Sequence, residues 1–305
     1  MGDNDKILLE SGTNEAELLT FKIDDQTFGI NVAKVQSILK YKGIVISEMP
    51  LVHPALLGMM IYREHTIPLI NLSSILEMQS SVDEDKQKII VTEFNRSVNA
   101  FLVDHVNRIF RVNWNDFVPM SNILDFNSSA VTGTVNIDGN DVMILDMEYL
   151  LQEIFPSLVI EEVTAETLEK SEAKNRGNVN IIFAEDSKLI RNNVIRLLGE
   201  AGYSRIKAFD SALPAYESLL TLAGQGGGAG LPDIVISDIE MPQMDGLTFC
   251  KKIKENVDLK NIKVVMFSSL INDQMIEKCR TVHADSYVAK PQTNELVGIL
   301  DEMSL

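Results

Sequence analysis

The 305-residue chain has few cysteines, few histidines and no long apolar run. Its two cysteines, Cys250 and Cys279, are too few for a structural zinc site and are expected as buried free thiols. The four histidines are scattered and show no metal-ligand spacing. No apolar run approaches the roughly 18 residues of a membrane span, and residues 1–12 lack the pattern of a signal peptide. These absences predict a cytoplasmic protein that does not insert into a membrane.

Basic residues are also scarce. The chain has 27 lysines and arginines against 44 acidic residues, for a net charge of −17. The negative charge is distributed unevenly: residues 1–177 carry a net charge of −13 and residues 178–305 a net charge of −4. Such an acidic chain is unsuited to nucleic acid or to anionic membrane surfaces, so protein partners are expected. Its length allows two domains.

The strongest pattern is a set of apolar runs that end in chemically active side chains. The run Ile234–Ser237 leads to Asp238, after which a proline and a glycine interrupt it. Three other runs behave alike: residues 180–184 lead to Glu185 and Asp186, residues 263–267 to Ser268, and residues 286–289 to Lys290. Segments with helical spacing separate these runs. Alternating strands and helices predict an α/β domain whose parallel strands end at one edge.

These side chains fit one kind of chemistry. A strand-end aspartate such as Asp238 is often only a turn residue, but here other groups converge on it. The acidic pair and Asp238 supply hard oxygen ligands for Mg²⁺, and the backbone carbonyl of Glu240 could supply a fourth. Lys290 can bind a phosphoryl oxygen, while the Ser268 hydroxyl can hydrogen-bond another. The set predicts a carboxylate that accepts a phosphoryl group, with Mg²⁺ as cofactor.

Residues 178–305 resemble the two-component receiver domain. The match includes the acidic pair, Asp238 followed by Met-Pro and Asp-Gly, the hydroxyl residue, and Lys-Pro. Asp238 precedes Ser268 by 30 positions and Lys290 by 52, as in chemotaxis-type receivers. The gap from Asp186 to Asp238 is longer than usual in the family, and we attribute it to a flexible glycine-rich insertion at residues 224–230. The resemblance implies a (βα)5 flavodoxin-like fold that a histidine kinase phosphorylates on Asp238.

Tyr287 occupies the position where chemotaxis receivers carry an aromatic residue that turns inward on activation. The resemblance implies that Tyr287 acts as a switch together with Ser268 and Lys290. The alternative is an amphipathic aromatic side chain on an outer strand.

The first half of the chain has the pattern of an all-β domain. Residues 1–14 are polar and expected to be disordered. A hairpin is predicted over residues 19–32, followed or overlapped by a short helix at residues 32–39. Further strands are predicted near residues 44–46, 57–62, 66–70, 89–94, 97–103, 106–112, 134–137 and 142–145, with a tight turn at Asp138-Gly139. Many short strands favour barrels or a sandwich. Asp104 and Asp146 are interpreted as solvated strand ends, because no nucleophile, base or metal-ligand set accompanies them in the sequence.

Residues 15–155 resemble the CheW-type coupling domain of bacterial chemotaxis. The similar pieces include Phe28-Gly29-Ile30, residues 58–63 followed by 68–72, and residues 103–106. Two departures are Asn71, where the family usually has Asp, and Tyr62, where Asn is common. The resemblance implies two small SH3-like five-stranded barrels that bind the cytoplasmic tip of chemoreceptors and the regulatory domain of the histidine kinase. Arg63 is either a solvated strand-end residue or an anchor of that interface.

Residues 156–177 begin with proline, end with glycine and read as a linker. A coupling domain followed by a receiver resembles the CheV-type architecture. This implies a non-enzymatic scaffold, located at the receptor array, whose coupling changes when Asp238 is phosphorylated. One alternative is a phosphate sink that drains the kinase without affecting coupling. An Mg²⁺-dependent phosphatase of the haloacid dehalogenase kind is disfavoured, because its nucleophile follows the first strand.

Overall fold

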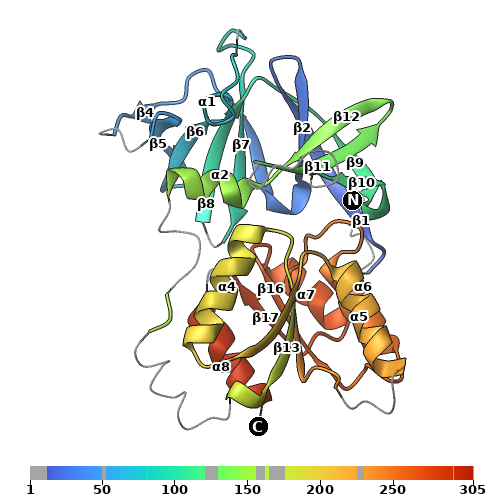
Figure 1. Cartoon of the computed structure of the whole chain (residues 1–305). Coiled ribbons are helices and arrows are strands. Elements are labelled where there is room, and N and C mark those ends of the chain that lie inside the picture. The colour runs from blue at the N-terminus through green and yellow to red at the C-terminus, as the bar shows by residue number, and fades with distance from the viewer. Residues whose placement is uncertain are drawn as a thin grey trace, which may run out of the picture. The chain divides into compact units, whose positions relative to one another are not determined.

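The computed structural model describes residues 12–49, 53–80, 82–95, 97–120, 130–155, 162–164, 176–224, 230–290 and 292–304. The main bodies of its two compact units are residues 17–112 with 116–160, and residues 161–305 (Figure 1). The predicted disorder of residues 1–14, the linker and the glycine-rich insertion fall largely outside the described residues. Within the described parts, no helix has the length and hydrophobicity to cross a membrane.

The amino-terminal unit contains two six-stranded sheets. The first has the order β10-β11-β12-β2-β1-β9. Its strands are β1 (Glu15–Ile23), β2 (Gln26–Asn31), β9 (His105–Asn113), β10 (Phe117–Pro119), β11 (Val131–Ile137) and β12 (Asn140–Leu145). β12 runs parallel to β2, with Met143 opposite Phe28. The sheet therefore joins the start of the unit to its end.

The second sheet is built from the chain between β2 and β9, in the order β3-β7-β8-β6-β5-β4. Its strands are β3 (Val35–Lys40), β4 (Ile46–Ser47), β5 (Leu56–Tyr62), β6 (His65–Asn71), β7 (Lys88–Phe94) and β8 (Ser97–Val103), with the short helix α1 (Leu72–Ile75) after β6. β6 and β8 pair in parallel, and the other described pairs in this sheet are antiparallel.

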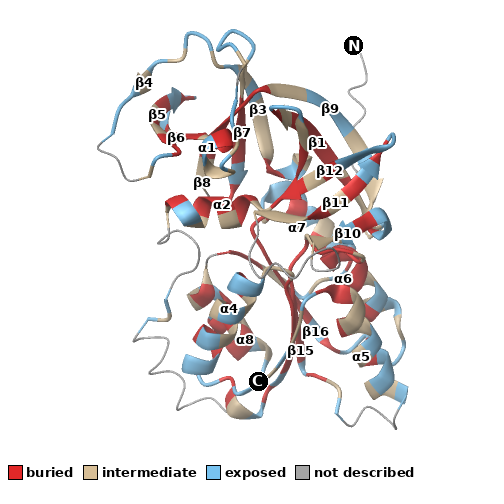
Figure 2. Cartoon of the chain, turned by 45° about the horizontal axis from the view of Figure 1, so that its top comes forward, coloured by how far each residue is buried: buried red, intermediate tan, exposed pale blue. Residues whose placement is uncertain are grey.

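One core joins the two sheets. It includes Phe21 and Ile30 from the first sheet, Ile90 and Phe101 from the second, and Leu150 from helix α2 (Met147–Ile154). These side chains are buried because strand residues alternate between faces and each sheet turns an apolar face inward. Figure 2 shows buried residues along the strands and on α2. The two sheets therefore form a single unit.

The predicted helix at residues 32–39 is wrong. Only residues 32–34 form one 3-10 turn, capped by the Asn31 side chain, which accepts a hydrogen bond from the Ala33 amide. The following residues form β3, which pairs with β7. Strand β10 was not predicted at all. The ten strands predicted in this unit divide equally between the sheets, and adding β3 and β10 gives six strands in each instead of the expected five.

Two aspartates of this unit are not the solvated strand ends that were expected. Asp104 is only 2% exposed, and its carboxylate accepts hydrogen bonds from the Asp24 amide and the Ser80 hydroxyl. Asp146 caps α2 by accepting from the amides of Glu148 and Tyr149. The predicted turn at Asp138-Gly139 is confirmed, since both residues have positive φ between β11 and β12.

The carboxyl-terminal unit is a five-stranded parallel sheet in the order β14-β13-β15-β16-β17. The strands are β13 (Asn180–Ala184), β14 (Arg205–Phe209), β15 (Ile234–Ser237), β16 (Lys263–Ser268) and β17 (Ser286–Ala289). The helices are α4 (Lys188–Glu200), α5 (Ala212–Gly224), α6 (Gly246–Glu255), α7 (Asp273–Thr281) and α8 (Thr293–Met303). Helices α4 and α8 lie on one side of the sheet and α5 and α6 on the other (Figure 1). The predicted α/β unit is confirmed.

Both cysteines lie in the core on the α6 and α7 side of this sheet. They are free and buried, as predicted. Burial raises the pKa of each thiol to about 12, so both are protonated and unreactive at neutral pH.

Candidate functional site

The predicted site lies at the carboxyl edge of the parallel sheet, where the strand order places β13 beside β15. Glu185 and Asp186 follow β13, Asp238 follows β15, Ser268 ends β16, and Lys290 follows β17. Adjacent registers align the strand ends, with Ala184 opposite Ser237. The topology therefore brings side chains from four separate strands to one edge.

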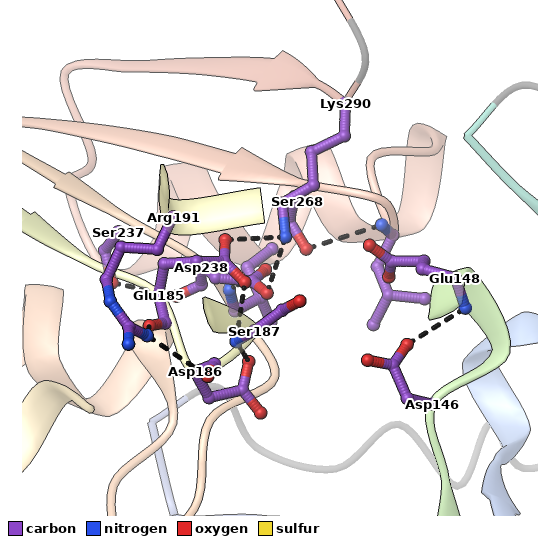
Figure 3. A network of polar contacts seen from close by, with 12 residues as sticks. Asp146, Glu148, Glu185, Asp186, Ser187, Arg191, Ser237, Asp238, Ser268 and Lys290 are labelled. Carbon is purple, nitrogen blue, oxygen red and sulfur yellow. Dashed lines mark hydrogen bonds and ion pairs between the residues drawn. The ribbon is translucent and has the colours of Figure 1, made fainter. Parts of the chain in front are cut away.

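Lys290 connects two of the predicted carboxylates. Its ammonium nitrogen lies 2.9 Å from Oδ2 of Asp238 and 2.8 Å from Oε2 of Glu185. Figure 3 shows the lysine side chain extended toward both groups. Lys290 is 1% exposed, Glu185 0% and Asp238 4%. A buried cation is thus held between two buried anions, and it stands where it could bind added negative charge near Asp238.

Three carboxylates gather within this edge. Oxygen atoms of Glu185, Asp186 and Asp238 lie within 4.8 Å of one another. Burial raises the pKa of Glu185 well above its ordinary range, the Lys290 ammonium opposes that rise, and Asp238 and Asp186 add to it. Lys290 pairs with two of these carboxylates, and the three together crowd negative charge at this edge.

The donor set and the charge of this cluster fit Mg²⁺. Carboxylate oxygens are the hard ligands that this cation prefers, and a divalent charge would offset the repulsion among them. Glu185, Asp186 and Asp238 would hold the ion. Glu240 is half-buried in the loop after β15, and its backbone carbonyl stays a predicted fourth ligand.

The loop that carries Asp238 is fixed by the start of α6. Asp245 caps this helix, and its carboxylate accepts from the Thr248 amide at 2.6 Å and the Thr248 hydroxyl at 3.0 Å. The Gly246 amide donates to the Ile239 carbonyl. A Cβ atom at Gly246 would come 1.9 Å from the Asp238 carbonyl oxygen. Only glycine allows the helix to begin this close to the Asp238 backbone.

Arg191 was missed by the sequence analysis. From α4 it donates to the backbone carbonyls of Glu185 at 2.5 Å and Asp186 at 3.2 Å, and so holds the acidic loop in place. No motif residue indicates this contact, because the arginine binds backbone atoms rather than another motif side chain.

Ser268 and Tyr287 lie on the neighbouring strands β16 and β17. Ser268 is buried, and its backbone carbonyl accepts from the Lys290 amide at 3.1 Å. Tyr287 is half-buried against the core, and its hydroxyl accepts from Arg280 at 3.3 Å. The phosphoryl-binding role of Ser268 and the switch role of Tyr287 stay predictions.

Arg63 belongs to the amino-terminal unit. It is exposed in the two-residue turn between β5 and β6, where it and Glu64 both have positive φ. Its guanidinium lies 5.0 Å from the centre of the Tyr62 ring, beside a cavity of about 290 Å³ that His65 and Glu93 also line. Arginine is enriched at protein interfaces, and the interface role of Arg63 stays a prediction.

Comparison with known proteins agrees with the division into an amino-terminal β unit and a carboxyl-terminal α/β unit. Residues 17–155 match the CheW-like domain and residues 181–301 the response regulator receiver domain. The protein is therefore a chemotaxis coupling protein that carries a receiver. The chain is 31% identical to chemotaxis protein CheV3 of Helicobacter pylori. This match covers 95% of the chain and 96% of CheV3. The chain belongs to the CheV family.

Two other similarities concern the amino-terminal half. Chemotaxis protein CheW of Thermotoga maritima is 29% identical over 48% of this chain and 94% of its own length. The crystal structure of the scaffolding protein TtCheW from Thermoanaerobacter tengcongensis covers 44% of this chain and 91% of its own, with 18% identity and a TM-score of 0.41.

Proposed function

We propose that a histidine kinase phosphorylates Asp238 and that the modification adjusts how the CheW-like domain couples chemoreceptors to that kinase. The observation that carries the proposal is the buried Lys290 ammonium, held 2.9 Å from Asp238 and 2.8 Å from Glu185 at the sheet edge. A plain turn aspartate would need no buried cation and no second carboxylate.

The transfer itself needs little from the protein beyond position and charge. A carboxylate oxygen of Asp238 attacks the phosphorus of a phosphohistidine. The new O–P bond forms as the P–N bond breaks, and the electron pair stays on the imidazole nitrogen, which takes up a proton from water. A Mg²⁺ ion bound by Glu185, Asp186 and Asp238 supplies charge neutralisation. The protein acts as a phosphoryl acceptor rather than as an enzyme with turnover on a metabolite.

The acyl phosphate then changes the contacts of the strand ends. Lys290 already touches Asp238, so its ammonium shifts from a carboxylate oxygen to a phosphoryl oxygen. The Ser268 hydroxyl donates to another phosphoryl oxygen. Both residues lie at the ends of neighbouring strands, so the loops that follow them reorganise together. Tyr287, on the strand that precedes the lysine, would respond with them.

The CheW-like domain is proposed to bind the cytoplasmic tip of chemoreceptors and the regulatory domain of the kinase, with Arg63 at the interface. This places the protein in the cytoplasm, at the receptor array on the inner face of the membrane. Residues 15–155 would act as the coupler and residues 178–305 as the regulator, joined by the linker at residues 156–177.

The test compares capture of receptor and kinase by the full chain with and without beryllofluoride, a mimic of the phosphoryl group. If phosphorylation adjusts coupling, beryllofluoride should change the amounts of receptor and kinase captured, and Asp238→Ala should remove this change. Equal capture in both states would refute the proposal. If Asp238→Ala leaves receptor control of the kinase intact but alters phosphate flow, the chain is a phosphate sink instead.

A further inference from the structure

A short piece of the linker is held on the outside of the receiver. The Asn294 side chain, in the first turn of α8, donates from Nδ2 to the Glu162 carbonyl at 3.1 Å and accepts at Oδ1 from the Thr164 amide at 3.0 Å. A side-chain amide has one donor face and one acceptor face. Here it binds the carbonyl of one residue and the amide two residues later, as a neighbouring strand would bind extended backbone.

A second contact fixes the same segment from α4. The Arg196 guanidinium donates to the Glu162 carboxylate through two nitrogens, at 2.8 and 3.2 Å. The same arginine also binds Glu200, which orients it along the helix. A two-nitrogen fork on one carboxylate is the strong form of this pair and sets direction as well as contact.

The segment is thus recognised in two ways. Asn294 binds backbone atoms and would accept other side chains at residues 162–164, whereas Arg196 binds only an acidic side chain at residue 162. The two anchors lie on different helices, and α4 and α8 lie against each other. One segment with an acidic first residue satisfies both.

The carboxyl-terminal end of the linker is anchored separately. Arg176, 2% exposed, donates to both carboxylate oxygens of Asp301 in α8, at 2.8 and 2.7 Å, and to the Ala201 carbonyl at 2.7 Å. The Tyr203 hydroxyl donates to the same aspartate at 2.9 Å. The receiver therefore holds the linker at residue 176 through a buried ion pair, and at residues 162–164 through exposed contacts.

We propose that the α4–α8 face of the receiver is a docking surface for the chain's own linker, with residues 162–164 as its occupant. Docking divides the linker and shortens the part that separates the two units. The proposal concerns the resting protein and does not depend on phosphorylation of Asp238.

The effect on reach follows from chain length. With the segment docked, residues 156–161 connect the two units; with it released, residues 156–175 do. At about 3.5 Å per residue, the greatest span rises from about 20 Å to about 70 Å. Docking would therefore limit how far the two units can separate.

Hydrogen exchange of the full chain tests the docking directly. Asn294→Ala removes the acceptor of the Thr164 amide without disturbing the buried core, so we expect that amide to exchange about tenfold faster or more. Asn294→Asp keeps an acceptor for this amide but sets a carboxylate against the Glu162 carbonyl. The exchange rate of the Thr164 amide in this variant should therefore fall between those of the natural protein and Asn294→Ala. Asn192→Ala is the matched control, because Asn192 is exposed on α4.

Equal exchange of the Thr164 amide in Asn294→Ala and Asn192→Ala would overturn the docking. Spin labels test the tether. The native cysteines are buried, so labels can be directed to Asp25→Cys and Glu217→Cys, both at exposed positions in different units. Asn294→Ala should broaden the distribution of label distances and shift it to longer values. A distribution that matches the Asn192→Ala control would overturn the shortened tether.

Discussion

Glu185→Gln should make the receiver more stable while removing its response to Mg²⁺. Glu185 is 0% exposed, and burial raises its pKa, which means that the folded protein disfavours its ionised form. The amide has a similar size and can still accept a hydrogen bond from Lys290. It removes one of the two carboxylates that pair with Lys290.

The expected gain is about 1–2 kcal/mol in the free energy of unfolding without Mg²⁺, within the range of single stabilising substitutions. We expect the relief from burying the Glu185 charge to exceed the loss of its ion pair with Lys290, because Lys290 keeps its partner Asp238 at 2.9 Å. For a domain of this size, the gain corresponds to a rise of roughly 3–10 °C in Tm.

Thermal unfolding followed by circular dichroism at 222 nm is the assay, because most described helices belong to the receiver. Mg²⁺ at 100 times its Kd should stabilise the natural protein by about 2.7 kcal/mol and leave Glu185→Gln nearly unchanged. The order of stability should therefore reverse when the ion is added.

The difference also depends on pH. A raised folded pKa contributes stability that is present below the unfolded pKa of about 4.3 and is lost as pH rises through the folded value. Without Mg²⁺, the advantage of Glu185→Gln should be small in acid and grow as pH rises. Glu255→Gln, an exposed change of the same charge, is the control. Lower stability of Glu185→Gln in chelator, or an equal response to Mg²⁺, would refute the reasoning.

Three further substitutions have defined outcomes. Gly246→Ala sets a Cβ atom 1.9 Å from the Asp238 carbonyl oxygen, so it should lower the free energy of unfolding by about 1–3 kcal/mol in chemical denaturation. It should also slow phosphorylation of Asp238 by a small phosphodonor. Unchanged values for both would contradict the contact. Arg176→Met leaves a buried carboxylate without its cation and should cost about 3–5 kcal/mol in the receiver transition, and a loss below 1 kcal/mol would be inconsistent with a buried pair. Arg63→Ala should weaken receptor or kinase capture about tenfold if Arg63 is an interface anchor, whereas Lys40→Ala should not.

The receiver site could be predicted because its residues stand at strand ends. A short apolar run followed by a polar side chain marks such an end, and parallel strands place all these ends at one edge. The approach of Lys290 to Asp238, across 52 positions, follows from that rule. Distances, the burial of Glu185 and the pairing of one lysine with two carboxylates required the structure.

Other features left no readable pattern. Val35, Ile38 and Leu39 have helical spacing, yet pairing with β7 makes this segment a strand, so tertiary contacts overrode the local preference. Arg176 lies 125 positions from Asp301, and nothing near either residue indicates their pairing. Strand β10 has only three residues, too few to show alternation.

The interleaved path of the two sheets sets an order for folding during synthesis. The second sheet is contiguous from residue 35 to 103 and can close first, whereas Phe28 must wait for Met143, about 115 residues later. Until then, the β1–β2 hairpin has an unpaired edge and an apolar face, which favours aggregation. A chain that ends after Val103 would therefore leave the β1–β2 hairpin without its neighbours β9 and β12, and chaperones should be needed most in that interval.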